Sequence, residues 1–185
     1  MMQQASLTSR MQRAAMLDVS LYEEVERDEN ATTQALFVVI IVALASAIGG
    51  ALDATLSNRP GALVGNALGG ILAALVGWVI WSGVTYFIGT QILRGTATYG
   101  ELLRTIGFAQ SPGVLLVLRF IPVLGGLIAL AVAIWQLVAG VVAIRQALDV
   151  TTGQAIVTVL LGWLAYVVFA AVLALLGLGA AFLAG

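Results

Sequence analysis

The residues best suited to chemistry in this chain are the few polar ones inside its apolar stretches. Among them only Arg119 is ionisable, and it stands between Leu118 and Phe120 in a hydrophobic run. An ionisable residue within a membrane span is the first place to look for function. Asp53, at the end of another apolar stretch, is the nearest opposite charge by expected depth. We predict an Asp53–Arg119 ion pair, which favours a structural role over ion conduction.

A layer of tryptophans and polar residues forms a second candidate site. These tryptophans lie well inside the apolar stretches, whereas interface belts place aromatic residues near the ends of spans. Polar groups at that depth usually hydrogen-bond across helices. The layer either lines an intramembrane ligand cavity or fills gaps between small residues, and both interpretations stay open. Its members are Asn66, Trp78, Trp81, Ser82, Thr85, Trp135, Gln136, Trp163 and Tyr166.

The residue types argue against an enzyme. The chain has no histidine and no cysteine, so the usual general base, the thiolate nucleophile and the soft metal ligands are missing. The acidic run EEVERDE at 23–29 is interpreted as a solvated helix face. With eight cations and a net charge of -1, nucleic-acid binding is not expected either. We therefore predict no catalytic residue, metal or cofactor.

Composition places the chain in a membrane. It has 185 residues, of which 61% are hydrophobic and 9% are charged, and its mean hydropathy is +1.07. A soluble domain carries about 25% charged residues. The lipid bilayer is thus the first expected partner, and the lysine-free, alanine- and glycine-rich usage suggests a prokaryotic cell membrane.

The chain divides into a polar head and an apolar body. Residues 1–34 hold nine charges, and an amphipathic repeat within them predicts one or two short cytoplasmic helices on the membrane or on the bundle. The repeat comprises Leu7, Met11, Ala14, Leu21 and Val25. The rest predicts an all-α polytopic bundle over 35–185, with a surface helix at about 99–109 and five transmembrane helices. These spans are expected at about 35–52, 62–93, 112–121, 124–148 and 154–184.

The third and fourth spans are separated by a turn. Pro122 cannot continue a helix, and Gly125 and Gly126 tolerate a sharp bend. The third helix is short, since ten residues of α-helix cover only about 15 Å. A re-entrant hairpin over 111–148 is the alternative to two crossings.

Charge placement predicts the orientation. Five crossings with the N terminus in the cytoplasm put six arginines inside and two outside, in agreement with the positive-inside rule. The C terminus is then outside. The inner group is Arg10, Arg13, Arg27, Arg94, Arg104 and Arg145, and the outer group is Arg59 and Arg119.

Small residues recur at four-residue steps along the second span. Such a ladder lets helix backbones approach closely, either within one chain or between copies in a homo-oligomer. Ordinary packing within the chain and an oligomer seam are both kept as interpretations. The ladder consists of Gly61, Gly65, Gly69, Ala73 and Gly77.

Three helix starts match the capping box, in which a hydroxyl and a later carboxylate or amide satisfy free backbone N–H groups. They begin at Ser20, Thr98 and Thr151, with Glu23, Glu101 and Gln154 three residues on. They predict the start of an N-terminal helix, of the surface helix and of the fifth span.

The order of these elements, and the stretch GFAQSP from Gly107 and Phe108 to Pro112, resemble the Yip family of Rab-interacting membrane proteins and its prokaryotic relatives. The family's Gly-Tyr-x-x-x-Pro element is matched with Phe108 in the tyrosine position, and residues 134–156 look like its fourth span and following loop. The resemblance covers about 17–185. It departs at DVSLYEEV, 18–25, which lacks the Gly-Pro of the eukaryotic Asp-Leu-Tyr-Gly-Pro element.

Eukaryotic members of that family are implicated in vesicle trafficking and membrane shaping, so the resemblance implies a non-catalytic role. We expect a scaffold, adaptor or accessory subunit that contacts other membrane proteins or its own copies. The alternative is a small transporter, channel or lipid-handling protein that uses the broken third and fourth helices.

Overall fold

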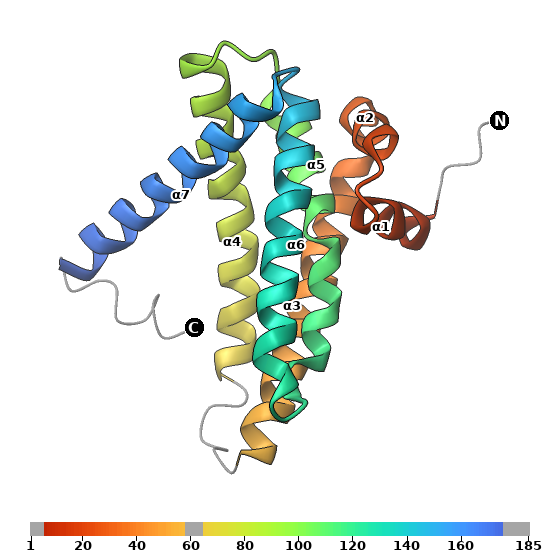
Figure 1. Cartoon of the computed structure of the whole chain (residues 1–185), viewed down its shortest axis with the longest axis vertical. Coiled ribbons are helices and arrows are strands. Elements are labelled where there is room, and N and C mark those ends of the chain that lie inside the picture. The colour runs from red at the N-terminus through yellow and green to blue at the C-terminus, as the bar shows by residue number, and fades with distance from the viewer. Residues whose placement is uncertain (1–5, 58–64, 176–185) are drawn as a thin grey trace.

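A computed structural model describes residues 6–57 and 65–175, with the side chains of 65–67, 165–167 and 169–175 excepted. Within these residues the chain forms an all-α bundle (Figure 1). The elements are α1 (Leu7–Ala15), α2 (Val19–Arg27), α3 (Ala31–Leu56), α4 (Gly65–Phe87), the π-helical turn η2 (Ile88–Ile92), α5 (Tyr99–Ala109), the 3₁₀ helix η3 (Ser111–Phe120), α6 (Leu124–Ala147) and α7 (Thr152–Leu175).

Among the described residues, three helices are long and apolar enough to cross a membrane: Ala31–Leu56, Leu68–Ile92 and Leu124–Ala147. They correspond to the first, second and fourth predicted spans, and α6 agrees with its prediction to within one residue. Helix α3 begins four residues earlier than expected, because Ala31 is fully buried in the core. The fifth predicted span begins at Thr152, and its last residues lie outside the described part.

The third predicted span differs most from expectation. Residues 111–120 form a 3₁₀ helix, which is narrower than an α-helix and rises about 2.0 Å per residue. Pro112 lies in its first turn, and η3 packs between α3 and α6. A Cβ on Gly49 of α3 would collide with the carbonyl oxygen of Leu116 in η3. The close approach of η3 to α3 therefore requires glycine, which has no side chain, at position 49.

Helix α5 has the predicted bounds but not the predicted location. Seven of its eleven residues are buried, and it packs against α2, α3, α4 and α6. The prediction of a surface helix was wrong because charged and hydroxyl residues in this segment are paired within the bundle. Arg104 and Thr105 are 7% and 0% exposed.

Two of the three predicted capping boxes are confirmed. The Glu101 amide donates to Thr98 Oγ1 at 3.3 Å and the Thr98 amide to Glu101 Oε2 at 2.7 Å. Thr151 and Gln154 pair in the same way at 3.0 and 3.3 Å. The third was wrong: α2 is capped by Asp18, whose Oδ1 accepts from the Ser20 amide at 3.0 Å.

The two ends of the bundle differ in what they contain. Helix α2, the loop from η2 to α5 and the turn between α6 and α7 lie at one end (Figure 1). The end of α3, the start of α4 and the turn between η3 and α6 lie at the other. We call the first the polar end, defined by residues 18–28, 93–101 and 145–154, and the second the far end.

Candidate functional site

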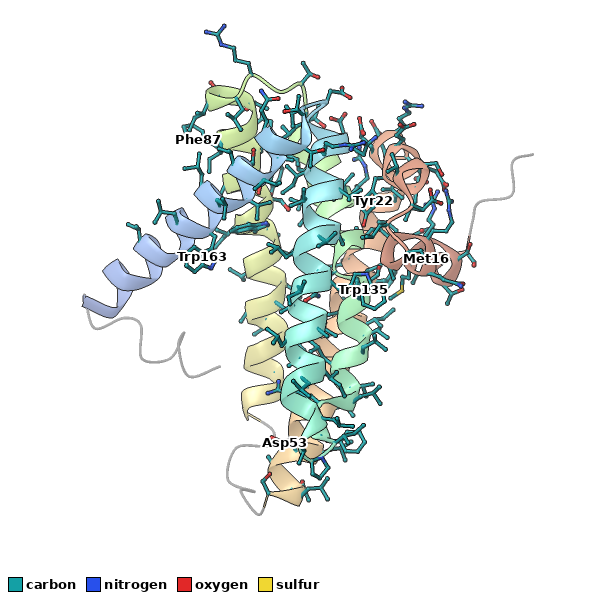
Figure 2. All side chains as sticks on the ribbon, viewed as in Figure 1. Met16, Tyr22, Asp53, Phe87, Trp135 and Trp163 are labelled. Atoms are coloured by element: carbon teal, nitrogen blue, oxygen red, sulfur yellow. The ribbon has the colours of Figure 1, made fainter. Side chains whose placement is uncertain are left out.

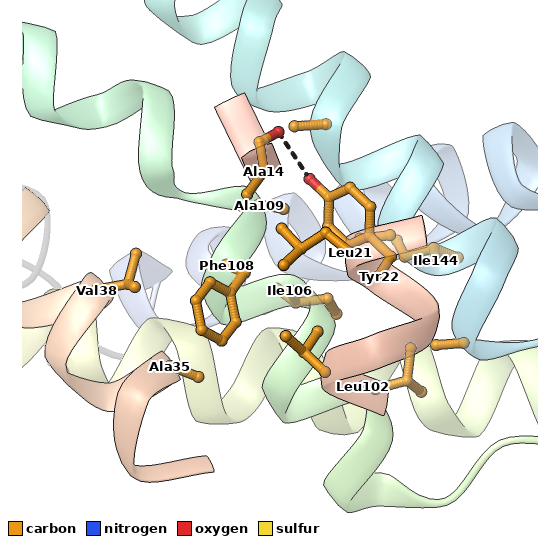
Figure 3. Packing of buried hydrophobic residues seen from close by; sticks show 14 of the residues in the cluster. Ala14, Leu21, Tyr22, Ala35, Val38, Leu102, Ile106, Phe108, Ala109 and Ile144 are labelled. Atoms are coloured by element: carbon orange, nitrogen blue, oxygen red, sulfur yellow. Dashed lines mark hydrogen bonds between the residues drawn. The ribbon is translucent and has the colours of Figure 1, made fainter. Parts of the chain in front are cut away.

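The N-terminal helices are docked on the bundle through a hydrophobic core. Leu21, Tyr22 and Val25 of α2 are fully buried beside Leu102 and Phe108 of α5 (Figure 3). Full burial of each large side chain stabilises such an arrangement by about 1.5–3 kcal/mol. Of the two predicted locations for these helices, the membrane surface and the bundle, the structure shows the bundle.

Tyr22 ties the two N-terminal helices together. Its hydroxyl donates to the carbonyl oxygen of Ala14 in α1 at 3.2 Å (Figure 3). Burial raises the pKa of Tyr22 above its ordinary value. The phenol therefore stays a neutral donor under any ordinary condition.

Arg10 is a buried cation in a four-residue network. Its guanidinium donates to Glu24 at 2.9 Å, to Asp28 at 2.8 Å and to Gln34 at 3.0 Å, and the residue is 3% exposed. These contacts join α1, α2 and α3. A buried charge with its donors satisfied in this way is costly to disturb, because removing one partner leaves an uncompensated charge.

Arg13 extends the same network toward the surface. It pairs with Asp18 at 2.8 Å and with Glu24 at 2.6 Å. Hydrogen bonds from Ser20 and then from Arg13 lower the pKa of Asp18 to about 2. Burial tends to raise the pKa of Glu24, but the hydrogen bonds from Arg13 and Arg10 outweigh it, so that this pKa is lowered.

Arg104 satisfies the C-terminal end of α2 from outside that helix. Its Nε donates to the carbonyl oxygen of Val25 at 2.9 Å and its Nη2 to that of Glu26. The last carbonyls of a helix have no partner within the helix, and the helix dipole favours a cation there. The buried arginine of α5 thus orients α2.

Acidic side chains gather at the polar end. Burial raises the pKa of Glu26, and the charges of Glu101 and Asp149 add to the effect. Glu23 accepts a hydrogen bond from Gln146 of α6 at 3.2 Å. Among the described residues no group of three or more acidic side chains is arranged to hold a metal ion.

The interpretation of residues 23–29 as a solvated helix face was wrong for Glu24 and Asp28, which pair with the buried Arg10. The roles of Arg10 and Arg104 were also missed. One signal was present, because Arg10 stands three residues after Leu7 and four before Ala14, on the stripe that packs inward. An arginine on such a stripe indicates a buried ion pair.

A cavity of about 600 Å³ lies between α3 and α4, and we call it the α3–α4 groove. Trp78, Trp81 and Gln136 of the predicted layer line it. Gln136 donates from Nε2 to the side-chain oxygen of Gln110 at 2.9 Å. The lining also includes Ala47 and Gly50 of α3, Gly70 and Gly77 of α4, and Arg119 of η3.

Other members of the predicted layer lie elsewhere. Ser82 and Thr85 are fully buried, and their hydroxyls have no hydrogen-bond partner among the described residues. Trp135 donates to the Ala15 carbonyl at 2.7 Å on the side of α1, near Met16 (Figure 2). Trp163 is 61% exposed on α7. The side chains of residues 66 and 166 lie outside the described ones.

The predicted ion pair between Asp53 and Arg119 is not formed. Within the described part of the chain the ion pairs belong to Arg10 and Arg13 alone. The stem of Arg119 packs on α3 one turn before Asp53, where its Cγ lies 2.9 Å from the position of a Cβ on Gly49. The Arg119 side chain passes over α3 at Gly49, where no side chain blocks it, and lines the groove.

The predicted turn lies between η3 and α6. A Cβ on Gly125 would collide with the Arg119 carbonyl, whereas Gly126 faces open space. Val123 takes the positive φ of the turn, 66°, between the exposed Pro122 and α6. The break therefore needs Gly125 for close packing and uses a valine for the strained conformation.

Two described members of the glycine ladder of α4, Gly69 and Ala73, are exposed, whereas Gly77 lines the α3–α4 groove. A Cβ at Gly69 or Gly77 would meet no atom within 4 Å, and Ala73 is exposed. Gly61 lies outside the described residues, and Gly65 is the first residue of α4. Gly69 and Ala73 therefore do not pack against another described helix of the same chain.

The motif residues have structural surroundings. A Cβ on Gly107 would lie 2.7 Å from Ala35 Cβ and 3.3 Å from Trp78 Nε1. Phe108 is fully buried, and Pro112 is buried in the first turn of η3. Gly107 thus allows α5 to contact α3 closely, and Pro112 lies where the chain changes from the α-helix α5 to the 3₁₀ helix η3.

Comparison with known proteins supports the family resemblance. The Yip1 domain model matches residues 19–183, from the start of α2 through almost all of the chain. No curated protein and no solved structure matches the chain significantly. The matched range includes the motif, the Arg104 contact with α2 and the α3–α4 groove. The chain therefore belongs to the Yip1-domain family of non-enzymatic integral membrane proteins.

Proposed function

We propose that this protein is a scaffold or adaptor whose polar end binds a partner protein in the cytoplasm. The observation that carries the proposal is the rigid docking of α2 on α5 by Tyr22, Phe108 and Arg104. A flexible N-terminal tail would not need the buried network of Arg10 with Glu24, Asp28 and Gln34, which fixes the position of α2. A preorganised surface binds with less loss of conformational freedom than a flexible tail does.

We further propose that the bundle crosses the membrane five times, with α5 and η3 together forming the third crossing. At about 1.5 Å and 2.0 Å per residue, they span about 36 Å, enough for the hydrocarbon core of about 30 Å. Helix α7 makes the fifth crossing. The N terminus is in the cytoplasm and the C terminus outside, since Arg27, Arg94 and Arg145 belong to the segments of the polar end, whereas Arg119 belongs to η3 toward the far end.

The partner surface consists of the outer side of α2 with the neighbouring α6–α7 turn. Glu23, Arg27 and Asp149 are exposed there. A shallow depression lined by Arg145, Gln146 and Thr152 lies in the same turn. Its mixed charges are typical of a protein contact with complementary charges, which gives specificity more than affinity.

The experiment is cross-linking and purification of the full chain from its native membrane, followed by identification of the proteins attached. Exchange of two charges, Glu23→Arg with Arg27→Glu, keeps the net charge and is expected to remove the partner. Val123→Asn, at the exposed far end, is the matched control and is expected to retain it. Recovery of the chain alone, or equal capture by both variants, would contradict the proposal.

A further inference from the structure

The α3–α4 groove needs an occupant. A cavity of about 600 Å³ is within the usual size of ligand sites, and a groove between two spanning helices borders the hydrocarbon of the bilayer. Its walls are small: Ala47 and Gly50 on α3, Gly70 and Gly77 on α4. A Cβ on any of the three glycines would meet no atom within 4 Å, so the chain leaves this space open.

Arg119 is the charged residue among the described residues that line this groove. Arg119 reaches it at the far end, where its stem crosses the backbone of α3 at Gly49. It forms no ion pair with any described carboxylate, and Asp53 is not part of the lining. A guanidinium at the end of an apolar groove is matched in charge by a phosphate, which it binds in a bidentate manner.

The other end of the groove, away from Arg119, has no charged side chain among its described lining residues. Trp78 and Trp81 line it, and Trp78 donates from Nε1 to the Leu103 carbonyl at 3.0 Å. Gln136 donates from Nε2 to the side-chain oxygen of Gln110 at 2.9 Å and to its carbonyl oxygen at 3.1 Å. The other polar side chains of the lining, Ser46, Gln110 and Gln136, are uncharged, so Arg119 supplies the charge of the groove. The small apolar residues between them suit a hydrocarbon chain.

The length of the groove agrees with such a chain. On α3 its lining runs from Val39 to Ala54, a rise of about 22 Å. One leaflet contributes about 15 Å of hydrocarbon. An acyl chain that enters beside Arg119 therefore reaches the tryptophans without leaving the groove.

We propose that the α3–α4 groove binds one anionic phospholipid, with its phosphate on Arg119 and an acyl chain between α3 and α4. Asp53 is the described carboxylate at the far end, so a helix from a second copy would offer Arg119 an anion only through that residue. The exposed ladder at Gly69 is not part of the groove lining and remains free for such a contact. The lipid site is independent of the partner surface at the polar end.

The test uses tryptophan quenching by brominated acyl chains. The full chain with Trp135→Phe and Trp163→Phe keeps only the two groove tryptophans, and it is placed in phosphatidylcholine vesicles containing brominated phosphatidylglycerol. Trp78 is 7% exposed, so lipid outside the groove reaches it poorly. Strong quenching is expected, and Gly70→Leu or Gly77→Leu in the same background is expected to remove most of it by filling the groove.

Gly140→Leu is the matched control. It places the same side chain inside a helix at a glycine with no atom within 4 Å, outside the groove lining, and should leave the quenching unchanged. Arg119→Gln should weaken the preference for brominated phosphatidylglycerol over brominated phosphatidylcholine by about tenfold, the loss expected for one charge-assisted contact.

Two results would overturn the proposal. One is equal quenching in the glycine-to-leucine variants within the groove and in the Gly140→Leu control. The other is absence of quenching together with cross-links between copies at position 77, which would show a second chain in the groove. Circular dichroism of each variant verifies that the helices are retained. A loss of quenching then means that the lipid is excluded from the groove, and not that the protein has unfolded.

Discussion

Gly107 of α5 lies against Ala35 of α3 so closely that a Cβ on the glycine would be 2.7 Å from Ala35 Cβ. This contact joins the family motif to the first long helix. Phe108, the next residue, is fully buried in the same core. The motif is thus explained by packing of α5 inside the bundle.

The contact predicts the effect of Gly107→Ala. The added methyl group forces α5 away from α3, and overpacking of this kind costs about 1–3 kcal/mol. Thermal unfolding in detergent should show a lower midpoint than the unmodified chain. Gly140→Ala, in open space on α6, is the control and should not lower it. Adding Ala35→Gly should restore much of the loss, and failure to do so would argue against this contact as the cause.

Arg104→Met is expected to loosen α2 without unfolding the long helices. It keeps much of the apolar stem but leaves the carbonyls of Val25 and Glu26 without their donor. Leaving such buried groups unsatisfied costs about 1–3 kcal/mol. Hydrogen exchange should increase in α1 and α2, while α6 stays protected. Arg94→Met, at an exposed position, is the control, and equal exchange in both variants would exclude the role of Arg104 in orienting α2.

Acidification is expected to release α1 from α2. The pKa of Asp18 in the fold is about 2 and that of Glu24 is lowered, both below their unfolded values near 4. The stability that they contribute is therefore present above about pH 4 and is lost as the pH falls toward 2. Hydrogen exchange of α1 measured over this range should rise. Asp18→Asn with Glu24→Gln should weaken the network at neutral pH and flatten the acid response, whereas Asp53→Asn should not.

Glu26 acts in the opposite direction. Its pKa is raised in the fold, so it favours folding below its unfolded value and loses that contribution as the pH rises through its folded value. Its exposure to solvent limits this effect. The acid-induced release should therefore be sharper in Glu26→Gln than in the unmodified chain. An unchanged profile would show that Glu26 does not contribute.

Asp53→Asn and Arg119→Gln are expected to act independently. The two residues form no ion pair, so the free-energy changes of unfolding should add within about 0.5 kcal/mol. A double-mutant cycle by denaturant or thermal unfolding measures this coupling. Clear non-additivity would mean that the pair forms in the membrane, and it would then compete with the phosphate proposed at Arg119.

The helix bounds were predictable because their causes are local. Capping boxes at Thr98 and Thr151 lie within four residues of sequence, and α5 and α7 begin where they indicate. The apolar length of α6 and the turn at Pro122 are equally local. Trp78 and Trp81, which stand on one face of a single helix, line the same groove, whereas Trp135 of the predicted layer lies elsewhere, because its partner, the Ala15 carbonyl, is 120 residues away.

The sequence by itself determined that this is an all-helical membrane protein of the Yip1-domain family, since composition, hydropathy and the motif at 107–112 are properties of single segments. Only the tertiary structure decided the depth of α5, the 3₁₀ form of η3 and the partners of Arg10, Arg104 and Arg119. The reason is physical: these depend on contacts between distant segments, such as Arg104 with Val25, 79 residues apart. A charge in an apolar pattern indicates that a partner exists, but packing determines which group it is.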